Sequence, residues 1–211
     1  MTRRVTDLTT GDLDVLPDRC RRCLFWELGG ARPADAAHPR PDALAADPIV
    51  QKEAWWSAVD GGIPGRVVRV DGRAIGYCAL GSAEAYARRR PPVPRLSDDA
   101  LFLATAWVEP EARGSGLGRL LVQAAVKEAL RRDLRAVEAY GDRRHRDGAC
   151  VLPCTWLLHE GFVVHEEHPR HPVMRLDVRT TVRWAESLED AAHQLVGRLA
   201  RGPTEVGEPV R

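Results

Sequence analysis

A short glycine-rich segment, residues 113–118 (R-G-S-G-L-G), carries the most informative chemistry in this sequence. The apolar run over residues 100–108 precedes it and predicts a buried strand. Residues 117–132 follow it with polar side chains at every fourth position, which predicts an amphipathic helix. A glycine-rich turn that opens a helix leaves several backbone N–H groups pointing one way, at the positive end of the helix dipole. The segment therefore predicts a cradle for a phosphate or pyrophosphate group.

Two common phosphate-binding motifs do not fit the spacing of these glycines. The dinucleotide fingerprint requires G-x-G-x-x-G, whereas Gly114, Gly116 and Gly118 alternate along the chain. A Walker A loop ends in Gly-Lys-Ser or Gly-Lys-Thr, and this segment continues with Arg119 after its last glycine. The pattern that fits is Arg-x-x-Gly-x-Gly, beginning at Arg113. A strand-to-helix turn without a ligand is the alternative interpretation.

The Arg-x-x-Gly-x-Gly pattern resembles the acyl-CoA-binding signature of the GNAT N-acetyltransferase superfamily, in which this turn follows the fourth strand. The ending W-L-L-H-E-G-F over residues 156–162 is similar to that family's last helix-to-strand step. More narrowly, the segments C-R-R-C-L-F-W-E and C-V-L-P-C resemble those of uncharacterised actinobacterial members. Over residues 4–178 the resemblance implies an α/β (α+β) GNAT fold. In that fold a mixed, mostly antiparallel sheet is splayed between strands 4 and 5 and has helices on both faces.

The same resemblance implies acetyl-CoA as the cosubstrate of an N-acetyltransferase that acts on a primary amine by direct attack within a ternary complex. The pantetheine arm would lie in the splay and pair with the backbone of Ala106, Trp107 and Val108. An N–H near Val108 would polarise the thioester carbonyl. The pyrophosphate would bind the backbone amides of Arg113, Gly114, Ser115, Gly116, Leu117, Gly118 and Arg119.

The acid and the base of such a reaction are less evident. An alkylammonium with a pKa near ~10 must lose a proton before it attacks, and the leaving thiolate must gain one. Many family members have a tyrosine acid where this chain has Leu157, and the predicted fourth strand contains no carboxylate. Glu138 and Tyr140, on a strand predicted over residues 135–140, are the remaining candidates because that strand would border the splay. A CoA-binding sensor or interaction protein without catalysis is the alternative function.

Patterning and turn residues predict the elements around this segment. A strand over 4–8, a helix or helix pair over 12–28 and a helix over 48–59 come first. The dipeptide Asp71-Gly72 is a strong turn signal, so residues 66–70 and 73–80 should form a hairpin. The long segment 81–99, with four arginines and three prolines, is a lid, a substrate-binding segment or an insertion. A helix over 150–160 and strands over 162–165 and 173–178 complete the domain.

An apolar stripe over residues 181–201 predicts a separate C-terminal amphipathic helix, and residues 202–211 a disordered tail. This helix would pack on its own chain or join a partner subunit, so we expect a monomer or a homodimer.

Composition limits the partners. The chain has 211 residues and a formal net charge of +1, which argues against nucleic-acid and membrane partners and leaves a small-molecule or protein amine acceptor. No run approaches the ~20 apolar residues of a membrane span, and no apolar run resembles a signal peptide, so we predict a cytoplasmic protein.

Four of the five cysteines lie in two closely spaced pairs, Cys20 with Cys23 and Cys150 with Cys154. Such spacing suits half of a zinc site or a disulfide, although thiols on amphipathic helices usually serve as small core residues. We predict no metal site here. Trp26, beside Glu27, is a candidate for the wall of an acceptor pocket, since this family usually binds its acceptor around the first two helices.

Overall fold

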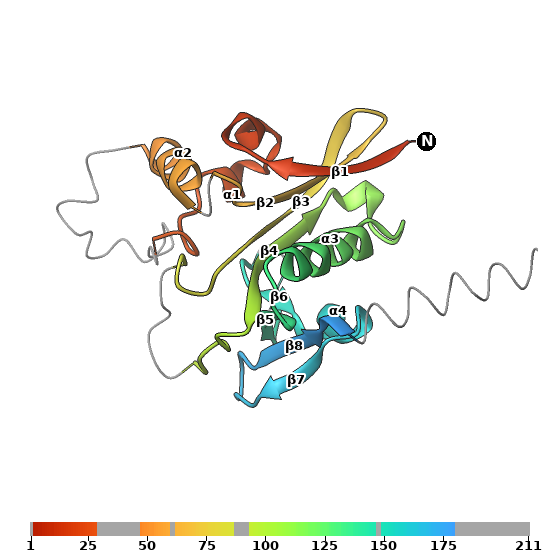
Figure 1. Cartoon of the computed structure of the whole chain (residues 1–211). Coiled ribbons are helices and arrows are strands. Elements are labelled where there is room, and N and C mark those ends of the chain that lie inside the picture. Colours follow the sequence, from red (N-terminus) through yellow and green to blue (C-terminus); the bar gives the residue numbers. More distant parts are fainter. Residues whose placement is uncertain (1, 29–46, 60–61, 87–92, 147–148, 180–211) are drawn as a thin grey trace, which may run out of the picture. The chain divides into compact units, whose positions relative to one another are not determined.

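A mixed β-sheet forms the centre of the chain in the computed structural model, which describes residues 2–28, 47–59, 62–86, 93–146 and 149–179 (Figure 1). The strands follow the spatial order β1-β2-β3-β4-β5-β8-β7, and β6 pairs with β5. The strands are β1 (Arg3–Leu8), β2 (Gly65–Val70), β3 (Arg73–Gly81), β4 (Ala100–Val108), β5 (Ala136–Asp142), β6 (Leu152–Pro153), β7 (Val163–Glu166) and β8 (Val173–Asp177). The helices are α1 (Asp18–Arg21), α2 (Pro48–Ala58), α3 (Leu117–Arg131) and α4 (Cys154–His159), with 3-10 turns η1 (Thr10–Val15) and η5 (Pro110–Ala112).

The parallel strands β4 and β5 separate soon after they meet, which confirms the predicted splay. Their ladder contains only the residue pairs Ala100–Ala136, Leu101–Val137 and Phe102–Glu138. The ladders β1–β2, β2–β3, β3–β4, β5–β8 and β7–β8 are antiparallel. Next to the point of separation the β3–β4 register shifts, because Ala79 pairs with Thr105 but Leu80 with Leu103, which leaves Ala104 as a bulge.

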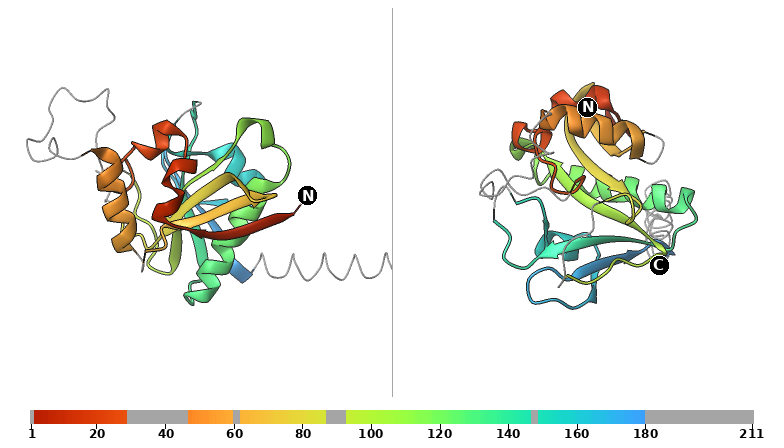
Figure 2. Two further views of the ribbon diagram at one scale, coloured as in Figure 1. Left: turned by 90° about the horizontal axis from the view of Figure 1, so that it is seen from above. Right: turned by 90° about the vertical axis from the view of Figure 1, so that its left-hand side faces the viewer.

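Helices cover both faces of the sheet (Figure 2). Alternate residues of a strand point to opposite faces, so Leu101 and Leu103 pack with α3 and α4, while Phe102 packs with the segment after α1. A third cluster joins η1 and α2 to β2 and β3 on the same face as Phe102, around Trp56. Helices α3 and α4 therefore lie on one face of the sheet, and the helices expected around the acceptor lie on the other.

Two predicted helices are shorter than expected. Residues 12–28 form η1 and the four-residue α1 rather than a long helix or helix pair, and Pro17 lies between them because its ring interrupts a helix. The helix predicted from Cys150 begins at Cys154 instead. Pro153 disfavours helical conformation in the residue before it, and Leu152–Pro153 pairs as β6 with the end of β5.

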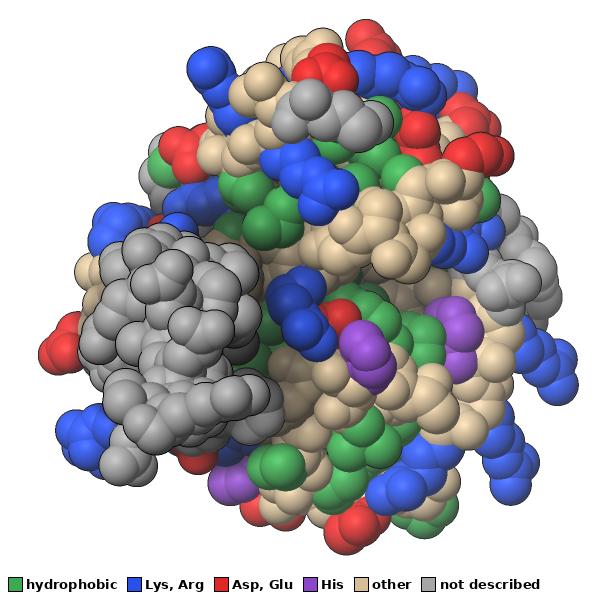
Figure 3. Space-filling view, turned by 90° about the vertical axis from the view of Figure 1, so that its right-hand side faces the viewer, with side chains coloured by type: hydrophobic (Ala, Val, Ile, Leu, Met, Phe, Trp, Pro, Cys, Tyr) green, Lys and Arg blue, Asp and Glu red, His purple; other side chains and the backbone are tan. Residues whose placement is uncertain are grey.

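By their internal contacts, the residues of the chain divide into two units, 1–178 and 179–211. The predicted C-terminal helix over 181–201 and the tail over 202–211 lie outside the described residues, as do Arg88, Arg89 and Arg90. In the part that is described, no helix is long and apolar enough to cross a membrane. Basic and acidic side chains are interspersed on the face seen in Figure 3, in keeping with the small net charge.

Candidate active site

The glycine-rich turn between β4 and α3 has a backbone that only glycine adopts without strain. Gly114 and Gly116 have φ angles of 76° and 84°, in the left-handed region that other residues rarely adopt. A Cβ added to either glycine would meet no atom within 4 Å. The space above the turn is therefore open, and a side chain there would project into it.

The amide groups at the start of α3 precede its hydrogen-bond ladder. Leu120 N–H donates the first helical bond, at 3.2 Å, to the Gly116 carbonyl. The N–H groups of residues 117–119 come earlier and have no preceding helical carbonyl to bind. Gly118 also lets α4 approach closely, because a Cβ on it would lie 3.3 Å from Nε1 of Trp156. The turn thus combines unsatisfied amides, a helix N-terminus and open space, which together suit an anion.

Arginine side chains surround the turn without filling it. Arg3 Nη1 donates to the Ser115 carbonyl at 3.0 Å, and Arg113 Nε donates to the Val108 carbonyl at 3.3 Å. Arg119 Nε lies 3.1 Å from Oε2 of Glu160, while more than half of the arginine side chain stays exposed. These contacts fix the Ser115 carbonyl of the turn and the Val108 carbonyl at the end of β4, and they place positive charge beside the amides of the turn.

The last residues of β4 have one paired edge and one edge that faces the splay. Ala106, Trp107 and Val108 pair with Cys78, Tyr77 and Gly76 of β3. The β4–β5 ladder ends at Phe102. The edge of these residues that is turned away from β3 therefore faces the gap between β4 and β5. An extended amide arm could therefore add to β4 there by main-chain hydrogen bonds.

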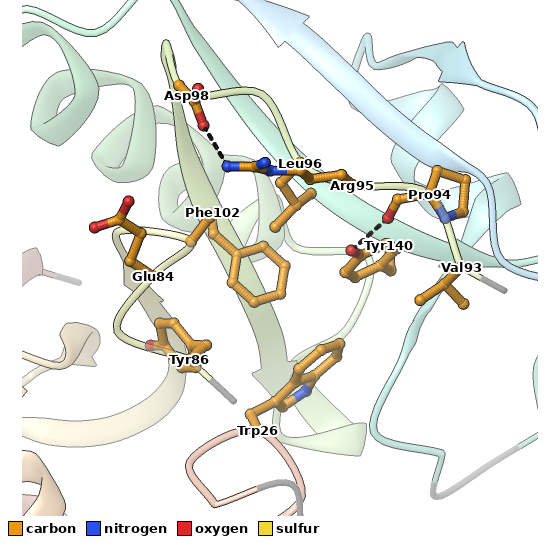
Figure 4. A pocket seen from close by; sticks show the side chains of 11 residues that line it. Trp26, Glu84, Tyr86, Val93, Pro94, Arg95, Leu96, Asp98, Phe102 and Tyr140 are labelled. Carbon is orange, nitrogen blue, oxygen red and sulfur yellow. Dashed lines mark hydrogen bonds and ion pairs between the residues drawn. The ribbon is translucent and has the colours of Figure 1, made fainter. Parts of the chain in front are cut away.

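A pocket of about 150 Å³ lies on the opposite face of the sheet, beside the point where β4 and β5 separate (Figure 4). Its walls include the rings of Trp26, Tyr86, Phe102 and Tyr140. The rings of Trp26 and Phe102 meet edge to face at 5.2 Å, and those of Trp26 and Tyr140 are nearly parallel at 6.2 Å. Phe102 is the last β4 residue paired with β5, so the pocket lies at the vertex of the splay.

Glu138, predicted as a catalytic candidate, is fully buried beside this pocket and its oxygens accept several hydrogen bonds. Ser97 donates from its backbone amide at 2.8 Å and from its hydroxyl at 2.7 Å. Arg175 Nη1 donates at 2.9 Å, and His165 Nε2 lies 3.8 Å away. Hydrogen bonding to Asp99, and then to Glu138, raises the pKa of Arg175, so this guanidinium stays charged. The carboxyl group of Glu138 is thus paired with Ser97 and Arg175.

Tyr140, the other catalytic candidate, also contacts the segment before β4. Its hydroxyl donates to the Pro94 carbonyl at 2.7 Å (Figure 4). Pro94 lines the pocket together with Arg95, Leu96 and Asp98. Both candidates on β5 therefore hold one wall of the pocket.

Sequence reasoning placed Trp26 in such a wall but did not single out Tyr86 or Phe102. The alternation of β4 could have indicated that Phe102 points away from Leu101 and its core. No local pattern indicated Tyr86, which reaches the pocket from the segment after β3. The place at which the family resemblance implies a tyrosine holds Leu157, fully buried in the core beneath α3.

The two closely spaced cysteine pairs of the sequence do not come together as one group of four. Cys154 is buried in the core shared with α3, whereas Cys23 and Cys150 have their Sγ atoms 3.5 Å apart on the other face. Within the described ranges, no group of three His, Cys, Asp or Glu side chains is arranged to hold a metal ion.

Comparison with known proteins identifies the family to which this chain belongs. The profile of the acetyltransferase (GNAT) family matches residues 25–150. A PaiA N-acetyltransferase from Thermoplasma acidophilum, solved with coenzyme A, has 16% identity and a TM-score of 0.53, with 84% of this chain and 99% of that one covered. A putative acetyltransferase, YncA, from Salmonella typhimurium, solved with acetyl-CoA, has 16% identity and a TM-score of 0.52, with coverages of 84% and 95%.

An N-acetyltransferase from Staphylococcus aureus Mu50 has 17% identity and a TM-score of 0.51, with 84% and 99% covered. No curated protein sequence matches the chain significantly. At these identities the structures show a shared fold, while the profile spans more than half of the sequence. The chain therefore belongs to the GNAT family of acetyltransferases.

Proposed function

We propose that this protein is an N-acetyltransferase that transfers the acetyl group of acetyl-CoA to a primary amine by direct attack within a ternary complex. The open glycine turn at the start of α3, beside the splay of β4 and β5, is the observation that carries the proposal. Family membership supports it, as do the two structures of similar fold that were solved with coenzyme A and with acetyl-CoA.

In this proposal main-chain atoms hold the cosubstrate. The amides of residues 114–119 bind the pyrophosphate, because that of Arg113 donates to the Pro110 carbonyl, and the splay-facing edge of Ala106, Trp107 and Val108 pairs with the pantetheine arm. Acetyl-CoA supplies the acetyl group as an activated thioester. An arm lying along β4 from the turn toward the bulge at Ala104 brings that thioester to the vertex of the splay.

The acceptor amine then approaches from the opposite face, through the aromatic pocket. A cavity of about 150 Å³ holds a group the size of a benzene ring. Its aromatic walls favour an amine with a compact apolar body. Because Glu138 is already paired with Ser97 and Arg175, we assign it and Tyr140 as positioning residues of the pocket wall, and the ammonium proton passes to solvent.

Two glycine variants test the cradle. Gly116 and Gly72 have φ angles of 84° and 86°, and a Cβ on either meets no atom within 4 Å, but Gly72 lies in the β2–β3 turn. Alanine therefore introduces similar backbone strain at both sites, about 1 kcal/mol. Calorimetric titration with acetyl-CoA should give a Kd raised at least tenfold for Gly116→Ala and unchanged for Gly72→Ala. Equal affinities in both variants would show that the turn does not hold the pyrophosphate.

A CoA-binding protein without catalysis is the second candidate. The buried Leu157 at the family's tyrosine position and the paired carboxylate of Glu138 favour it. Thiol release from acetyl-CoA, measured with a broad panel of amines, distinguishes the two candidate functions. Turnover with any amine rules out a CoA-binding protein without catalysis. The cytoplasmic location, the monomeric or homodimeric state and the resemblance to actinobacterial members stay predictions from the sequence.

A further inference from the structure

Two thiols meet next to the aromatic pocket, and the proposed acetyl transfer uses neither. Cys23 follows α1 and Cys150 precedes β6, 127 residues further along the chain, yet their Sγ atoms lie 3.5 Å apart. Both side chains are half-buried, so small solutes can reach them. A disulfide requires an S–S distance of ~2.05 Å, so closing this pair needs a sulfur movement of only about 1.5 Å.

The surroundings of Cys23 favour its thiolate. A hydrogen bond with Cys150 lowers the pKa of Cys23 to about 6, against a smaller rise from burial. Glu27 raises this pKa and Lys52 lowers it, and these two side chains form a buried ion pair with each other. A thiol with such a pKa is mostly ionised at neutral pH, and the thiolate is the form that reacts with oxidants.

Two other cysteines of the chain lack these properties. Burial raises the pKa of Cys78 to about 12, and burial also raises the pKa of Cys154. Both belong to the core beneath α3. They behave as small apolar core residues, as buried thiols usually do. The chain therefore contains both a reactive thiol and inert ones, which allows a site-selective reaction.

We propose that Cys23 and Cys150 are a redox modification site that closes into a disulfide when the protein meets a peroxide or a low-molecular-weight disulfide. With hydrogen peroxide, the Cys23 thiolate attacks one oxygen and becomes a sulfenic acid, and the other oxygen leaves as water after protonation. Cys150 then attacks the sulfenic sulfur, a second water leaves, and the S–S bond forms. Two thiols lose two electrons and two protons, and the peroxide is reduced to two waters.

The modification has a route to the acceptor pocket. Trp26 Nε1 donates to the Cys150 carbonyl at 3.1 Å, and the Trp26 ring forms part of the pocket wall. Drawing Cys23 and Cys150 together moves the two segments that hold this ring. The cradle for the cosubstrate lies on the opposite face of the sheet and shares none of these contacts. This consequence rests on the proposed function, whereas disulfide formation does not.

Peptide mapping of the full-length protein tests the pair. After treatment with hydrogen peroxide or oxidised glutathione, we expect one intramolecular crosslink between the Cys23 and Cys150 peptides, reversed by dithiothreitol. Cys23→Ser and Cys150→Ser should each abolish it, whereas Cys20→Ser, which changes a half-buried thiol three residues before Cys23, should not. No crosslink with either oxidant, or a crosslink that involves a different cysteine, overturns the proposal.

Alkylation kinetics give a second, independent measurement. The rate at which iodoacetamide modifies Cys23 should reach half of its maximum near pH 6 and move upward, toward the pH of about 8.5 typical of a free thiol, in Cys150→Ala, which removes the donor. An unchanged profile in that variant would show that Cys150 does not activate Cys23.

Kinetics of the oxidised protein then test the link to the pocket. We expect a severalfold change in the KM for the amine, with the Kd for acetyl-CoA within twofold of the reduced protein. A disulfide with an unchanged amine KM would refute the link to the pocket alone. Absence of thiol release in the reduced protein would instead count against the proposed function, and the crosslink would be unaffected.

Discussion

Ser97 donates two hydrogen bonds to Glu138, from its backbone amide to Oε2 at 2.8 Å and from its hydroxyl to Oε1 at 2.7 Å. This pairing joins the segment before β4 to the strand on the other side of the splay. The same buried carboxylate also accepts a hydrogen bond from Arg175, so both of its oxygens are occupied by donors of the protein itself. We therefore expect Glu138 to hold the pocket wall in place and not to accept a proton from the substrate.

Ser97→Ala should change substrate positioning rather than the chemical step. The variant removes one charge-assisted hydrogen bond, which costs about 1.5–3 kcal/mol of stability. We expect a severalfold higher KM for the amine, a kcat within about threefold and an unshifted pH profile of kcat/KM. Ser57→Ala, which removes a hydroxyl contact with a backbone carbonyl on α2, is the matched control. A pH profile whose acid limb moves would instead assign Glu138 as the general base.

Tyr140→Phe separates a structural hydroxyl from a catalytic one. The ring stays in the pocket wall, and only the hydrogen bond to the Pro94 carbonyl is lost. We expect kcat to fall by less than about fivefold, measured by thiol release at saturating substrates. Loss of a general acid typically lowers the rate by 10²–10⁴, and a fall of that size would make Tyr140 the acid.

The aromatic pocket should select among amines of similar basicity. Benzylamine places a benzene ring among Trp26, Phe102 and Tyr140, whereas ethanolamine leaves that volume to water. We therefore expect kcat/KM to be at least tenfold higher for benzylamine, and Trp26→Leu to reduce this preference without changing the Kd for acetyl-CoA. A preference for ethanolamine would contradict the assignment of the pocket to the acceptor body.

Glu128 should make stability depend on acid pH. Burial raises the pKa of this carboxyl, but hydrogen bonds from Arg131 and Arg132 outweigh it and lower the pKa from 4.5 to about 2. Because the pKa of Glu128 is depressed in the folded protein, its ionised carboxyl group stabilises the fold fully above pH 4.5. This stabilisation is lost as the pH falls toward 2. The ionised carboxyl group contributes about 3 kcal/mol to the free energy of unfolding at neutral pH.

Urea unfolding of Glu128→Gln measures this contribution. The variant should be less stable than the parent by about that amount at pH 7, and the difference should shrink between pH 4.5 and pH 2. Glu53→Gln, an exposed change on α2, should leave the parent's pH dependence intact. A difference that stays constant over this range would assign the loss to packing and not to charge.

Local chemistry in the sequence was sufficient to predict several parts of the structure. Asp71-Gly72 forms the β2–β3 turn with φ angles of 49° and 86°, and the turn at Gly114 and Gly116 has the expected open backbone. These features depend on neighbouring residues. The extent of α1 was not predictable from polarity alone, because the proline at position 17 had to be weighed against an amphipathic pattern.

The candidate site contains features that no local signal specifies. The pocket brings together Trp26, Tyr86, Phe102 and Tyr140 from four separate segments, and their meeting depends on strand order and on which face each side chain occupies. The role of Glu138 was equally hidden, since its partners Ser97 and Arg175 lie 41 and 37 residues away in sequence. Spacing along a chain does not reveal such long-range pairing.

The proposed cradle consists of main-chain amides, and this has an evolutionary consequence. A site made from the backbone survives the replacement of nearly every side chain around it, provided that a few glycines keep the turn. A PaiA N-acetyltransferase with 16% identity to this chain shares its fold. The opposite face consists of side chains and can change its preference by point substitution. Natural selection can therefore exchange one half of the reaction while it inherits the other.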